Sequence, residues 1–598
     1  TEFDSDLAFL AKAKTNPDIF TERQMRGTEW DTPKQSEIAK FERLMAKTDI
    51  AADDPMIKGM PICETMWTGK CKRLASGTID KLNARCVLRG DLHKKYYHVT
   101  DNQAFAPVSR NSSLCSCEAV GRIYEQHYCS GDVPGAYLQG EQFQCEQVVA
   151  RPPPGFRKWD ERGVEILWLM NNPMYGQDDA GAIWNRTAND YLTDDKPRGC
   201  EFNRCPHEPC VYSKWDSPPS SDDYINRVTC GTYVDDWRLY NDPATEAKRE
   251  SAWIKNRLKE RFGLEFRASD PEDDFFLGSN RTSLSRSNAT LHATTFLELS
   301  VKRFLGSLEA LDEFPPSWSY SPSDPSMQKD WEEACAKRSC DDKELIREYQ
   351  QLFGTLLHAV KYRPEVEATL NLCGTCLTFP TKPMKGWLTR TLVYLGRTRK
   401  MGVTYSNKGK DADVLRAYAD SNWSETRSTT GFCIMLAGGA IAHSSKRQHC
   451  ITLSSCEAEL IALCDTAVEL IYIIGLVEFI GHKVTGSVEV STDNKGAYDL
   501  CHRFTSAQHS RHVDRKLFKM RELRGASIVK VGLVPTENNP ADLFTKILGR
   551  STCEKHRATV MNTAADERKS DKSASAQTKA NVTSTGSAVL ERDRAAKT

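Results

Sequence analysis

Hydrophobic and polar positions follow different periods along the chain and divide it into segments. Residues 1–60 are charged and mostly helical in pattern, and SEIAKFERLMAK shows the clearest helical period. Residues 61–305 mix strand-like runs with helices, residues 341–408 are helical again, and residues 409–550 alternate strands with helices. These patterns predict an α+β protein of several domains that begins with a helical extension over 1–60.

Two further segments have compositions that do not predict a packed core. Residues 306–340 are rich in proline and serine, and we interpret them as a linker between folded units. Residues 551–598 are small, polar and charged, and we expect them to be a disordered tail.

A pair of adjacent aspartates lies where a tight turn is predicted. In INRVTCGTYVDDWRLYND, Asp235 and Asp236 separate two short β-rich runs, which indicates a hairpin with the carboxylates at its turn. About a hundred residues earlier, Asp132 ends another predicted strand. Neighbouring carboxylates repel by roughly 4 kcal/mol at about 4 Å, and a divalent cation such as Mg²⁺ offsets this repulsion. A solvated turn is the alternative for an isolated pair.

A second set of acidic residues lies in the region 409–550. Apolar positions from Leu460 to Val477 keep a helical period, and we interpret them as a core-facing helix. Four carboxylates, by contrast, occupy strand ends or helix starts: Asp420, Glu459, Asp493 and Asp542. Glu457 competes with Glu459 for the second of these places.

Composition restricts the class of protein. The chain has 598 residues, with 81 Lys plus Arg and 81 Asp plus Glu, so any electropositive groove must be local. No apolar run approaches the roughly 18 to 20 residues that span a bilayer, so we expect no membrane partner. Because the first residue is Thr and no secretory signal follows it, we expect a fragment or a processed product.

The 21 cysteines are scattered, which favours reduced thiols in an intracellular protein over a disulfide framework. Cys200, Cys205, His207 and Cys210 have irregular spacing, so free thiols are a better interpretation than zinc. Cys373 and Cys376 form a lone CxxC motif, for which we favour packing.

An ordered series of motifs resembles the copia type of LTR retrotransposon polyprotein, from about residue 30 to 548. The series includes LNARCVLRGDL, FAPVSRNSSL, SGDVPGAYLQGE, RPPPGF, YVDD and FFLGSNRT. The resemblance implies a reverse transcriptase with fingers and palm over 61–305 and a helical thumb or connection over 341–408. It also implies that Asp132, Asp235 and Asp236 are the polymerase triad, which holds two metal ions.

The same resemblance suggests residues that contact the incoming nucleotide. Tyr137 lies five residues after Asp132, where the family carries an aromatic gate against the ribose 2′-OH; a buried palm aromatic is the alternative. Arg85 resembles a fingers cation that meets the triphosphate, with Lys81 assisting, although solvated charges are nearly as good an interpretation. Gln177 is a further candidate for the nucleotide site.

The final blocks resemble a ribonuclease H domain over 409–550. AYADSNW, SCEAELIAL, TDNKGA and PTENNPADLFTK stand in the family's order. The resemblance implies that Asp420, Glu459, Asp493 and Asp542 hold two divalent ions at a phosphodiester, and the AELIAL motif favours Glu459 over Glu457.

These observations predict an RNA-directed DNA polymerase with ribonuclease H activity, dependent on Mg²⁺ or alternatively Mn²⁺. The expected partners are an RNA template, a DNA primer, an RNA–DNA hybrid and deoxynucleoside triphosphates. Since capsid, protease and integrase lie upstream in the family, we expect the C-terminal part of a polyprotein. The expected location is intracellular: cytoplasmic within particles, with the nucleus as a further site.

One departure from the family supports a rival interpretation. Asp178 and Asp179 replace family basic residues, and acidic groups near nucleic acid weaken binding. The alternative function is therefore a decayed, non-catalytic remnant that binds nucleic acid.

Overall fold

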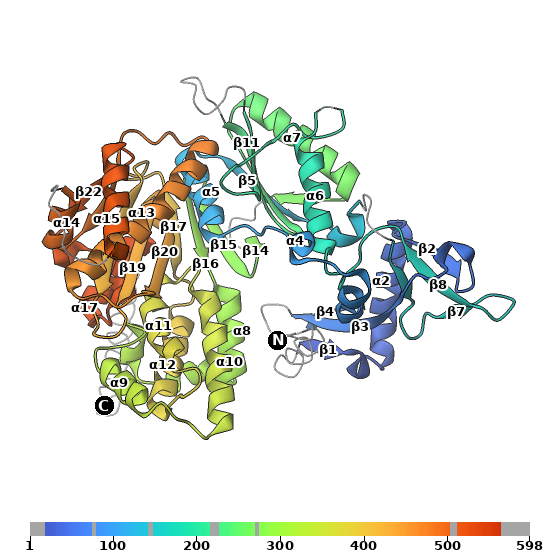
Figure 1. Cartoon of the computed structure of the whole chain (residues 1–598), viewed down its shortest axis with the longest axis horizontal. Coiled ribbons are helices and arrows are strands. Elements are labelled where there is room, and N and C mark those ends of the chain that lie inside the picture. The colour runs from blue at the N-terminus through green and yellow to red at the C-terminus, as the bar shows by residue number, and fades with distance from the viewer. Residues whose placement is uncertain are drawn as a thin grey trace, which may run out of the picture. The chain divides into compact units, whose positions relative to one another are not determined.

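The computed structural model describes residues 18–73, 79–141, 147–195, 197–215, 226–268, 274–502 and 511–563. Contacts divide the described residues into two units. The first unit extends to Gly278 and includes Tyr472–Lys483; the second contains Ser279–Ile471 and the residues from Val484 onward. Each unit mixes helices with sheets, so the chain is an α+β protein as predicted (Figure 1).

The first sheet of unit 1 has seven strands in the order β1-β3-β6-β8-β2, with β4 paired to β3 and β7 paired to β8. Its strands are β1 (Ile19–Thr21), β2 (Lys47–Ala51), β3 (Ile62–Arg73), β4 (Ile79–Leu88), β6 (Val149–Arg151), β7 (Lys158–Trp159) and β8 (Glu165–Met170). Helix α2 (Asp31–Arg43) packs on this sheet, and α3 (Gly90–Tyr97) and α4 (Asp101–Ala104) follow β4.

The second sheet of unit 1 is antiparallel and has six strands in the order β13-β5-β12-β11-β10-β9. The strands are β5 (His127–Asp132), β9 (Asn203–Arg204), β10 (Val211–Trp215), β11 (Asn226–Tyr233), β12 (Asp236–Asn241) and β13 (Glu265–Ala268). Its accompanying helices are α5 (Asn111–Ile123), α6 (Ala180–Thr193) and α7 (Thr245–Phe262). Trp184, Trp237 and Phe262 form the centre of the core that these elements share.

Unit 2 begins with β15 (Ser279–Ser285) and β16 (Asn288–His292), and β16 pairs with β17 (Gly402–Ser406). A group of helices lies between these strands in the sequence (Figure 1). They are α8 (Thr294–Leu305), α9 (Met327–Lys337), α10 (Lys343–Ala359), α11 (Glu367–Thr375) and α12 (Lys382–Arg397).

A five-stranded mixed sheet completes unit 2, in the order β20-β19-β18-β21-β22. The first three strands are antiparallel, whereas β18, β21 and β22 are parallel. The strands are β18 (Arg416–Asn422), β19 (Thr429–Leu436), β20 (Gly439–Arg447), β21 (Val488–Thr492) and β22 (Val529–Leu533). The helices are α13 (Ser455–Phe479), of which the residues before Tyr472 belong to this unit, α14 (Lys495–His502), α15 (Arg511–Gly525), α16 (Asp542–Thr545) and α17 (Arg550–Met561).

The expectation of a helical extension over 1–60 is wrong for its described part. Strands β1 and β2 pair with β3 and β8, so the segment completes the first sheet. Trp30 and Phe41 are fully buried and share a core with Trp67 and Trp168. The helical period of α2 was visible in the sequence. Strands β1 and β2 are too short for an alternation of polar and apolar residues to be recognised.

The expected linker over 306–340 is also wrong, because the segment is ordered and packed. It contains η5 (Glu309–Glu313), η6 (Pro316–Ser319) and α9. Arg397 of α12 donates to the carbonyl oxygens of Leu311, Phe314 and Pro315 at 2.5–2.7 Å. These bonds tie the backbone of the segment to α12.

Two domain boundaries differ from the expected ones. The division between units falls after Gly278 rather than at 305, because β16 pairs with β17. The expected tail over 551–598 begins instead with helix α17, whose Cys553, Val560 and Met561 are buried. Residues 564–598 lie outside the described residues.

Helix α13 corrects the expectation about apolar runs. It is long and apolar enough to cross a bilayer by length and composition, and 61% of its most apolar window is buried in the protein. Such burial is typical of a core helix, so the feature is weak evidence for a membrane span.

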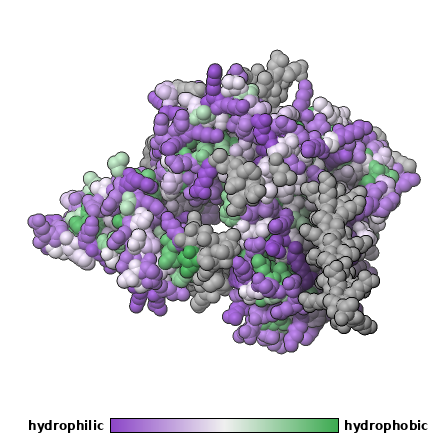
Figure 2. Space-filling model, turned by 180° about the vertical axis from the view of Figure 1, so that it is seen from behind, coloured by the Kyte–Doolittle hydropathy of each residue, from purple (hydrophilic) through white to green (hydrophobic). Residues whose placement is uncertain are grey.

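The face shown in Figure 2 is mainly hydrophilic, with hydrophobic residues in small scattered patches.

Candidate active sites

The hairpin of β11 and β12 brings the first aspartates together. Asp236 is opposite Asp132 in the antiparallel pairing of β12 with β5, and Asp235 lies in the turn. The carbonyl oxygen of Asp235 accepts a hydrogen bond from the backbone N–H of Val133 at 2.8 Å. Asp132, Asp235 and Asp236 therefore lie at neighbouring ends of two interior strands of the six-stranded sheet, although their carboxylates do not form a group as close as the one described below for unit 2.

The turn is held in an unfavourable backbone conformation. Val234 has φ +55°, which is rare for a β-branched residue. Its carbonyl oxygen accepts hydrogen bonds from the indole Nε1 of Trp184 at 2.8 Å and of Trp237 at 3.2 Å. Two indole donors on one carbonyl offset the strain and fix the direction in which Asp235 and Asp236 leave the turn.

A cavity of about 760 Å³ opens beside these aspartates within unit 1. Asp132, Asp235 and Asp236 line it on the side of the six-stranded sheet. Five cationic side chains also line it: Lys40, Lys70, Lys81, Arg85 and Arg267. The cavity therefore combines carboxylates for divalent cations with positive groups for an anion such as a triphosphate.

Arg85 lines the cavity, whereas Tyr137 does not line it and lies behind Tyr175, an aromatic neighbour that both residues share. The guanidinium of Arg85 lies 4.9 Å from the ring centre of Tyr175, which lines the cavity. Tyr137, in η4 (Ala136–Gln139), packs against the same ring at 5.6 Å between centroids. Burial raises the pKa of the Tyr137 hydroxyl, the charge of Asp235 raises it further, and Arg85 lowers it.

Gln177 and the two acidic residues after it do not line this cavity. The Gln177 side chain is buried and donates to Asp179 at 2.8 Å, and Asp179 is itself buried. Asp178 pairs with Nδ1 of His93 at 3.1 Å. The loop that departs from the family therefore directs its charges into local contacts.

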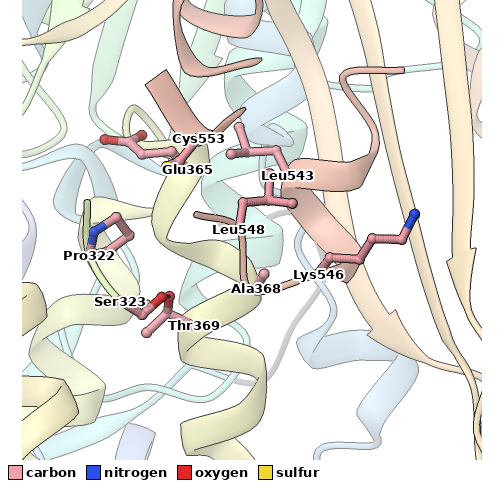
Figure 3. A pocket seen from close by; sticks show the side chains of 9 residues that line it. All are labelled: Pro322, Ser323, Glu365, Ala368, Thr369, Leu543, Lys546, Leu548 and Cys553. Carbon is pink, nitrogen blue, oxygen red and sulfur yellow. Dashed lines mark hydrogen bonds between the residues drawn. The ribbon is translucent and has the colours of Figure 1, made fainter. Parts of the chain in front are cut away.

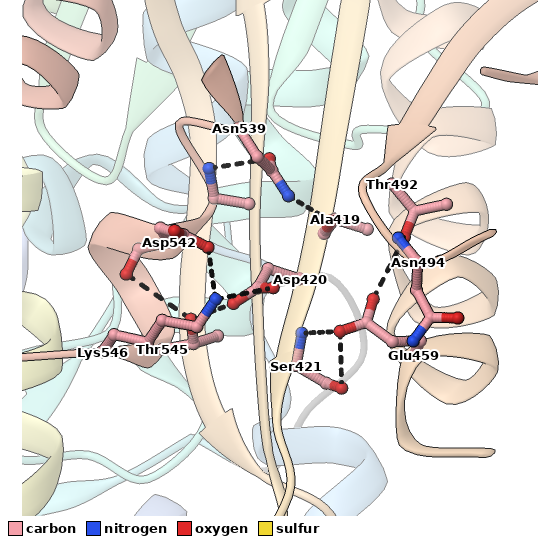
Figure 4. Close-up of polar contacts among 11 residues, drawn as sticks. Ala419, Asp420, Ser421, Glu459, Thr492, Asn494, Asn539, Asp542, Thr545 and Lys546 are labelled. Atoms are coloured by element: carbon pink, nitrogen blue, oxygen red, sulfur yellow. Dashed lines mark hydrogen bonds and ion pairs between the residues drawn. The ribbon is translucent and has the colours of Figure 1, made fainter. Parts of the chain in front are cut away.

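The second carboxylate cluster lies at the ends of β18 and β21 in unit 2 (Figure 4). Asp420, Glu459 and Asp493 offer ligand oxygens that all lie within 4.8 Å of one another. Among the described residues this is the one such group of His, Cys, Asp or Glu. Its all-oxygen donor set fits a hard cation such as Mg²⁺ or Mn²⁺.

Hydrogen bonds orient Glu459 toward the cluster. One carboxylate oxygen accepts from the backbone N–H of Ser421 at 2.8 Å and from its hydroxyl at 2.9 Å. The other accepts from the Thr492 hydroxyl at 3.1 Å. Glu457 instead accepts from the backbone N–H of Leu453 at 2.6 Å and caps the start of α13. Glu459, rather than Glu457, is thus the member of the cluster.

Asp542 joins the cluster through a lysine. Nζ of Lys546 lies 2.6 Å from Asp542 and 3.4 Å from Asp420, and the Thr545 hydroxyl donates to Asp420. Asp420 and Asp542 are both buried. Asp420 is therefore shared between the group with Glu459 and Asp493 and the contact with Asp542.

Burial and mutual repulsion set the electrostatics of the cluster. Desolvation and the charge of Glu459 raise the pKa of Asp420 well above its usual range. Desolvation raises the pKa of Glu459 to about 7, against the hydrogen bonds from Ser421. Although burial opposes its charge, Asp420 and Asp542 hold the pKa of Lys546 above its ordinary value. A divalent cation would favour the ionised carboxylates.

The cysteine candidates are distributed through the cores. Cys200, Cys205 and Cys210 are buried, whereas His207 is exposed. Cys373 and Cys376 are buried, and the carbonyl oxygen of Cys373 accepts from the Tyr349 hydroxyl at 2.8 Å.

Sequence reasoning missed several residues at both sites. Lys70 and Arg267 line the large cavity, and Lys546 lies in the ribonuclease H-like cluster. Asn83 was also missed, although it lies at an alternate position of β4 between the predicted Lys81 and Arg85, and all three line the cavity. Lys546 closes the PADLFTK motif, but nothing in the sequence indicates that its ammonium turns back toward Asp420.

Comparison with known proteins agrees with this arrangement. Residues 56–304 match the family described as reverse transcriptase (RNA-dependent DNA polymerase). The Pol polyprotein from transposon TNT 1-94 of Nicotiana tabacum is 24% identical over 505 residues, covering 83% of this chain and 35% of that protein. The Pol polyprotein from transposon RE2 of Arabidopsis thaliana is 29% identical over 496 residues, covering 82% of this chain and 31% of that protein.

A foamy viral protease-reverse transcriptase, solved in complex with double-stranded DNA, aligns with 85% of this chain and 70% of that chain. The sequence identity is 12% and the TM-score is 0.45.

Residues 56–304 are thus similar to the reverse transcriptase family, and the five-stranded mixed sheet lies in the part of the chain after them. Over most of its length the chain is similar to these retrotransposon Pol polyproteins, in agreement with the copia-type motifs of the sequence. It spans about a third of the length of these two relatives.

Proposed function

We propose that this chain is an RNA-directed DNA polymerase that also cleaves the RNA strand of RNA–DNA hybrids. The convergence of Asp132, Asp235 and Asp236 on a cavity lined by cations carries the proposal. Template RNA, primer DNA and deoxynucleoside triphosphates are the substrates that follow from it.

In the polymerase site, the three aspartates would hold the divalent ions, which would supply charge stabilisation for phosphoryl transfer. Lys81 and Arg85, which line the same cavity, would neutralise the triphosphate. Tyr137 and Tyr175 form the aromatic side of the nucleotide site. Gln177 supports the loop before α6 from its buried position and is not proposed as a nucleotide contact.

In the second site, Asp420, Glu459, Asp493 and Asp542 would hold the ions, which would supply charge stabilisation for cleavage of the phosphodiester. Ser421 and Thr492 keep Glu459 turned toward them. The hybrid is recognised through its backbone and 2′-hydroxyl groups rather than its base sequence.

A non-catalytic remnant gains no support from the acidic loop. Its Asp178 is paired with His93, and its Asp179 is buried with Gln177, so neither removes charge from the cavity.

Primer extension tests the polymerase proposal directly. The purified chain, given an RNA template, a DNA primer, deoxynucleotides and Mg²⁺ or Mn²⁺, should extend the primer. Asp236→Asn is the matched negative control, since it keeps the side-chain shape and removes the charge. If the parent extends no better than this variant with either metal, the polymerase proposal is wrong.

A further inference from the structure

Lys546 places a positive charge inside the second carboxylate cluster. Its Nζ is 2.6 Å from Asp542 and 3.4 Å from Asp420. Figure 4 shows Lys546 between these two carboxylates. The contact lies on one side of Asp420, while Glu459 and Asp493 lie close to it as a separate group of ligands. The ammonium therefore bridges Asp420, which belongs to the group with Glu459 and Asp493, and Asp542, which does not.

The packing of Lys546 lets its head group move while its stem stays fixed. The stem lines a small cavity of about 10 Å³, together with Ala368, Leu543 and Leu548 (Figure 3). Figure 3 shows the ammonium directed away from this cavity. About a third of the side chain is exposed, so the ammonium can turn into solvent without crossing the core.

The ammonium of Lys546 and a divalent ion cannot both occupy the space between Asp420 and Asp542. Ions in a two-metal site lie about 3.5–4 Å apart and share a bridging carboxylate. Asp420 is the residue common to both groups here, so the second ion would contact Asp420 and Asp542. An ammonium within hydrogen-bonding distance of Asp542 occupies that position and repels a divalent ion from it.

We propose that Lys546 is a displaceable internal cation that holds the place of the second divalent ion. The chain then binds one ion at Asp420, Glu459 and Asp493, and a second binds only when the ammonium withdraws. A phosphate of the hybrid offers the ammonium a new anionic partner, which couples entry of the second ion to substrate binding. This inference rests on the proposed function of the cluster as a metal site.

Counting bound Mn²⁺ tests the inference without measuring activity. All chains carry Asp235→Asn and Asp236→Asn to weaken metal binding at the polymerase site, and free Mn²⁺ is measured by electron paramagnetic resonance. Lys546→Met removes the charge and keeps the apolar stem; Lys546→Arg keeps the charge. Lys555→Ala is the matched control, because it removes an exposed lysine of α17 that contacts the loop before Asp542, at Glu537 and Asn538, but not the carboxylate cluster. Thermal melting checks that each chain folds, and Lys546→Gln replaces the Met variant if that variant does not.

We expect one Mn²⁺ per chain in the background, in Lys546→Arg and in Lys555→Ala, and two in Lys546→Met. A nucleic-acid hybrid should raise the background from one ion to two. Equal stoichiometry in the background and Lys546→Met, whether one or two, would overturn the inference.

A further variant separates this outcome from failure of the proposed function. Adding Asp493→Asn to the background should remove the bound ion. If the background binds no Mn²⁺ and Asp493→Asn changes nothing, the cluster is not a metal site, and the proposed ribonuclease activity fails with the inference. If the background binds an ion that Asp493→Asn removes but Lys546→Met adds none, only the inference fails.

Discussion

At the scale of single residues, local partners decide which acidic groups remain available to a metal. Asp178 is paired with His93, and Glu457 caps α13, so neither contributes to a carboxylate cluster. Asp420 and Glu459 differ because they lie beside other carboxylates in a buried place, which raises the pKa of each. Buried carboxylates that repel one another without a nearby compensating charge indicate a metal site more clearly than the number of acidic residues does.

Tyr137 provides a test of sugar selection. Its ring packs against Tyr175 at the wall of the cavity, and its hydroxyl lies in the field of Asp235. Tyr137→Ala removes the ring, so ribonucleotides should be incorporated at least about tenfold more often, which corresponds to about 1.4 kcal/mol of lost discrimination. Single-nucleotide incorporation with matched ribo- and deoxyribonucleotides measures the ratio. Unchanged discrimination, with DNA synthesis retained, would exclude Tyr137 as the gate.

Asp242 provides a test of pH dependence. Burial raises the pKa of its carboxyl to about 6, although the Gln126 side chain donates to it at 2.9 Å. Since the folded state holds this proton more tightly than the unfolded chain, Asp242 lowers stability as the pH rises from about 4 to 6. Asp242→Asn should therefore be more stable than the parent at pH 8, by about 1 kcal/mol after allowance for solvent screening, and similar at pH 4. Denaturant unfolding at both pH values measures this, and an equal difference at both would contradict it.

At the scale of elements, periodic segments were predictable and segments held by distant partners were not. The hairpin around Asp235 and the strands ending at Asp132 and Asp493 follow from short alternating runs, and the structure contains them. The segment 306–340 has no period of its own, because the groups that order it come from Arg390 and Arg397 of α12. No pattern within the segment could indicate those partners.

Arg397 therefore controls the order of this segment. Arg397→Met removes the guanidinium donor from the carbonyl oxygens of Leu311, Phe314 and Pro315, although those of Leu311 and Pro315 also accept from backbone N–H groups. The expected loss is about 2–3 kcal/mol of local stability, seen as faster hydrogen exchange over 309–319. The exposed Arg347→Met on α10 is the control and should exchange like the parent. Unchanged exchange in Arg397→Met would show that other contacts order the segment.

At the scale of the whole molecule, each compact unit carries its own carboxylate cluster. Asp132, Asp235 and Asp236 belong to the first unit, and Asp420, Glu459, Asp493 and Asp542 belong to the second. The sequence indicated both clusters because their members end strands or begin helices. It did not indicate Lys546, whose position depends on how α16 packs against β18 and β19. The position of Lys546 and the order of segment 306–340 both depend on contacts between elements far apart in the sequence, so neither could be predicted from the local pattern.

Separation of the two activities tests the central claim most directly. Asp235→Asn and Asp493→Asn are made in the full chain, and primer extension and hybrid cleavage are measured for both, with melting as the folding control. Each change should lower its own activity by a factor of a hundred or more, about 2.7 kcal/mol or more of transition-state stabilisation, and leave the other activity nearly intact. If Asp235→Asn abolished both activities in a well-folded chain, or if neither change affected either activity, the assignment of two independent carboxylate sites would be contradicted.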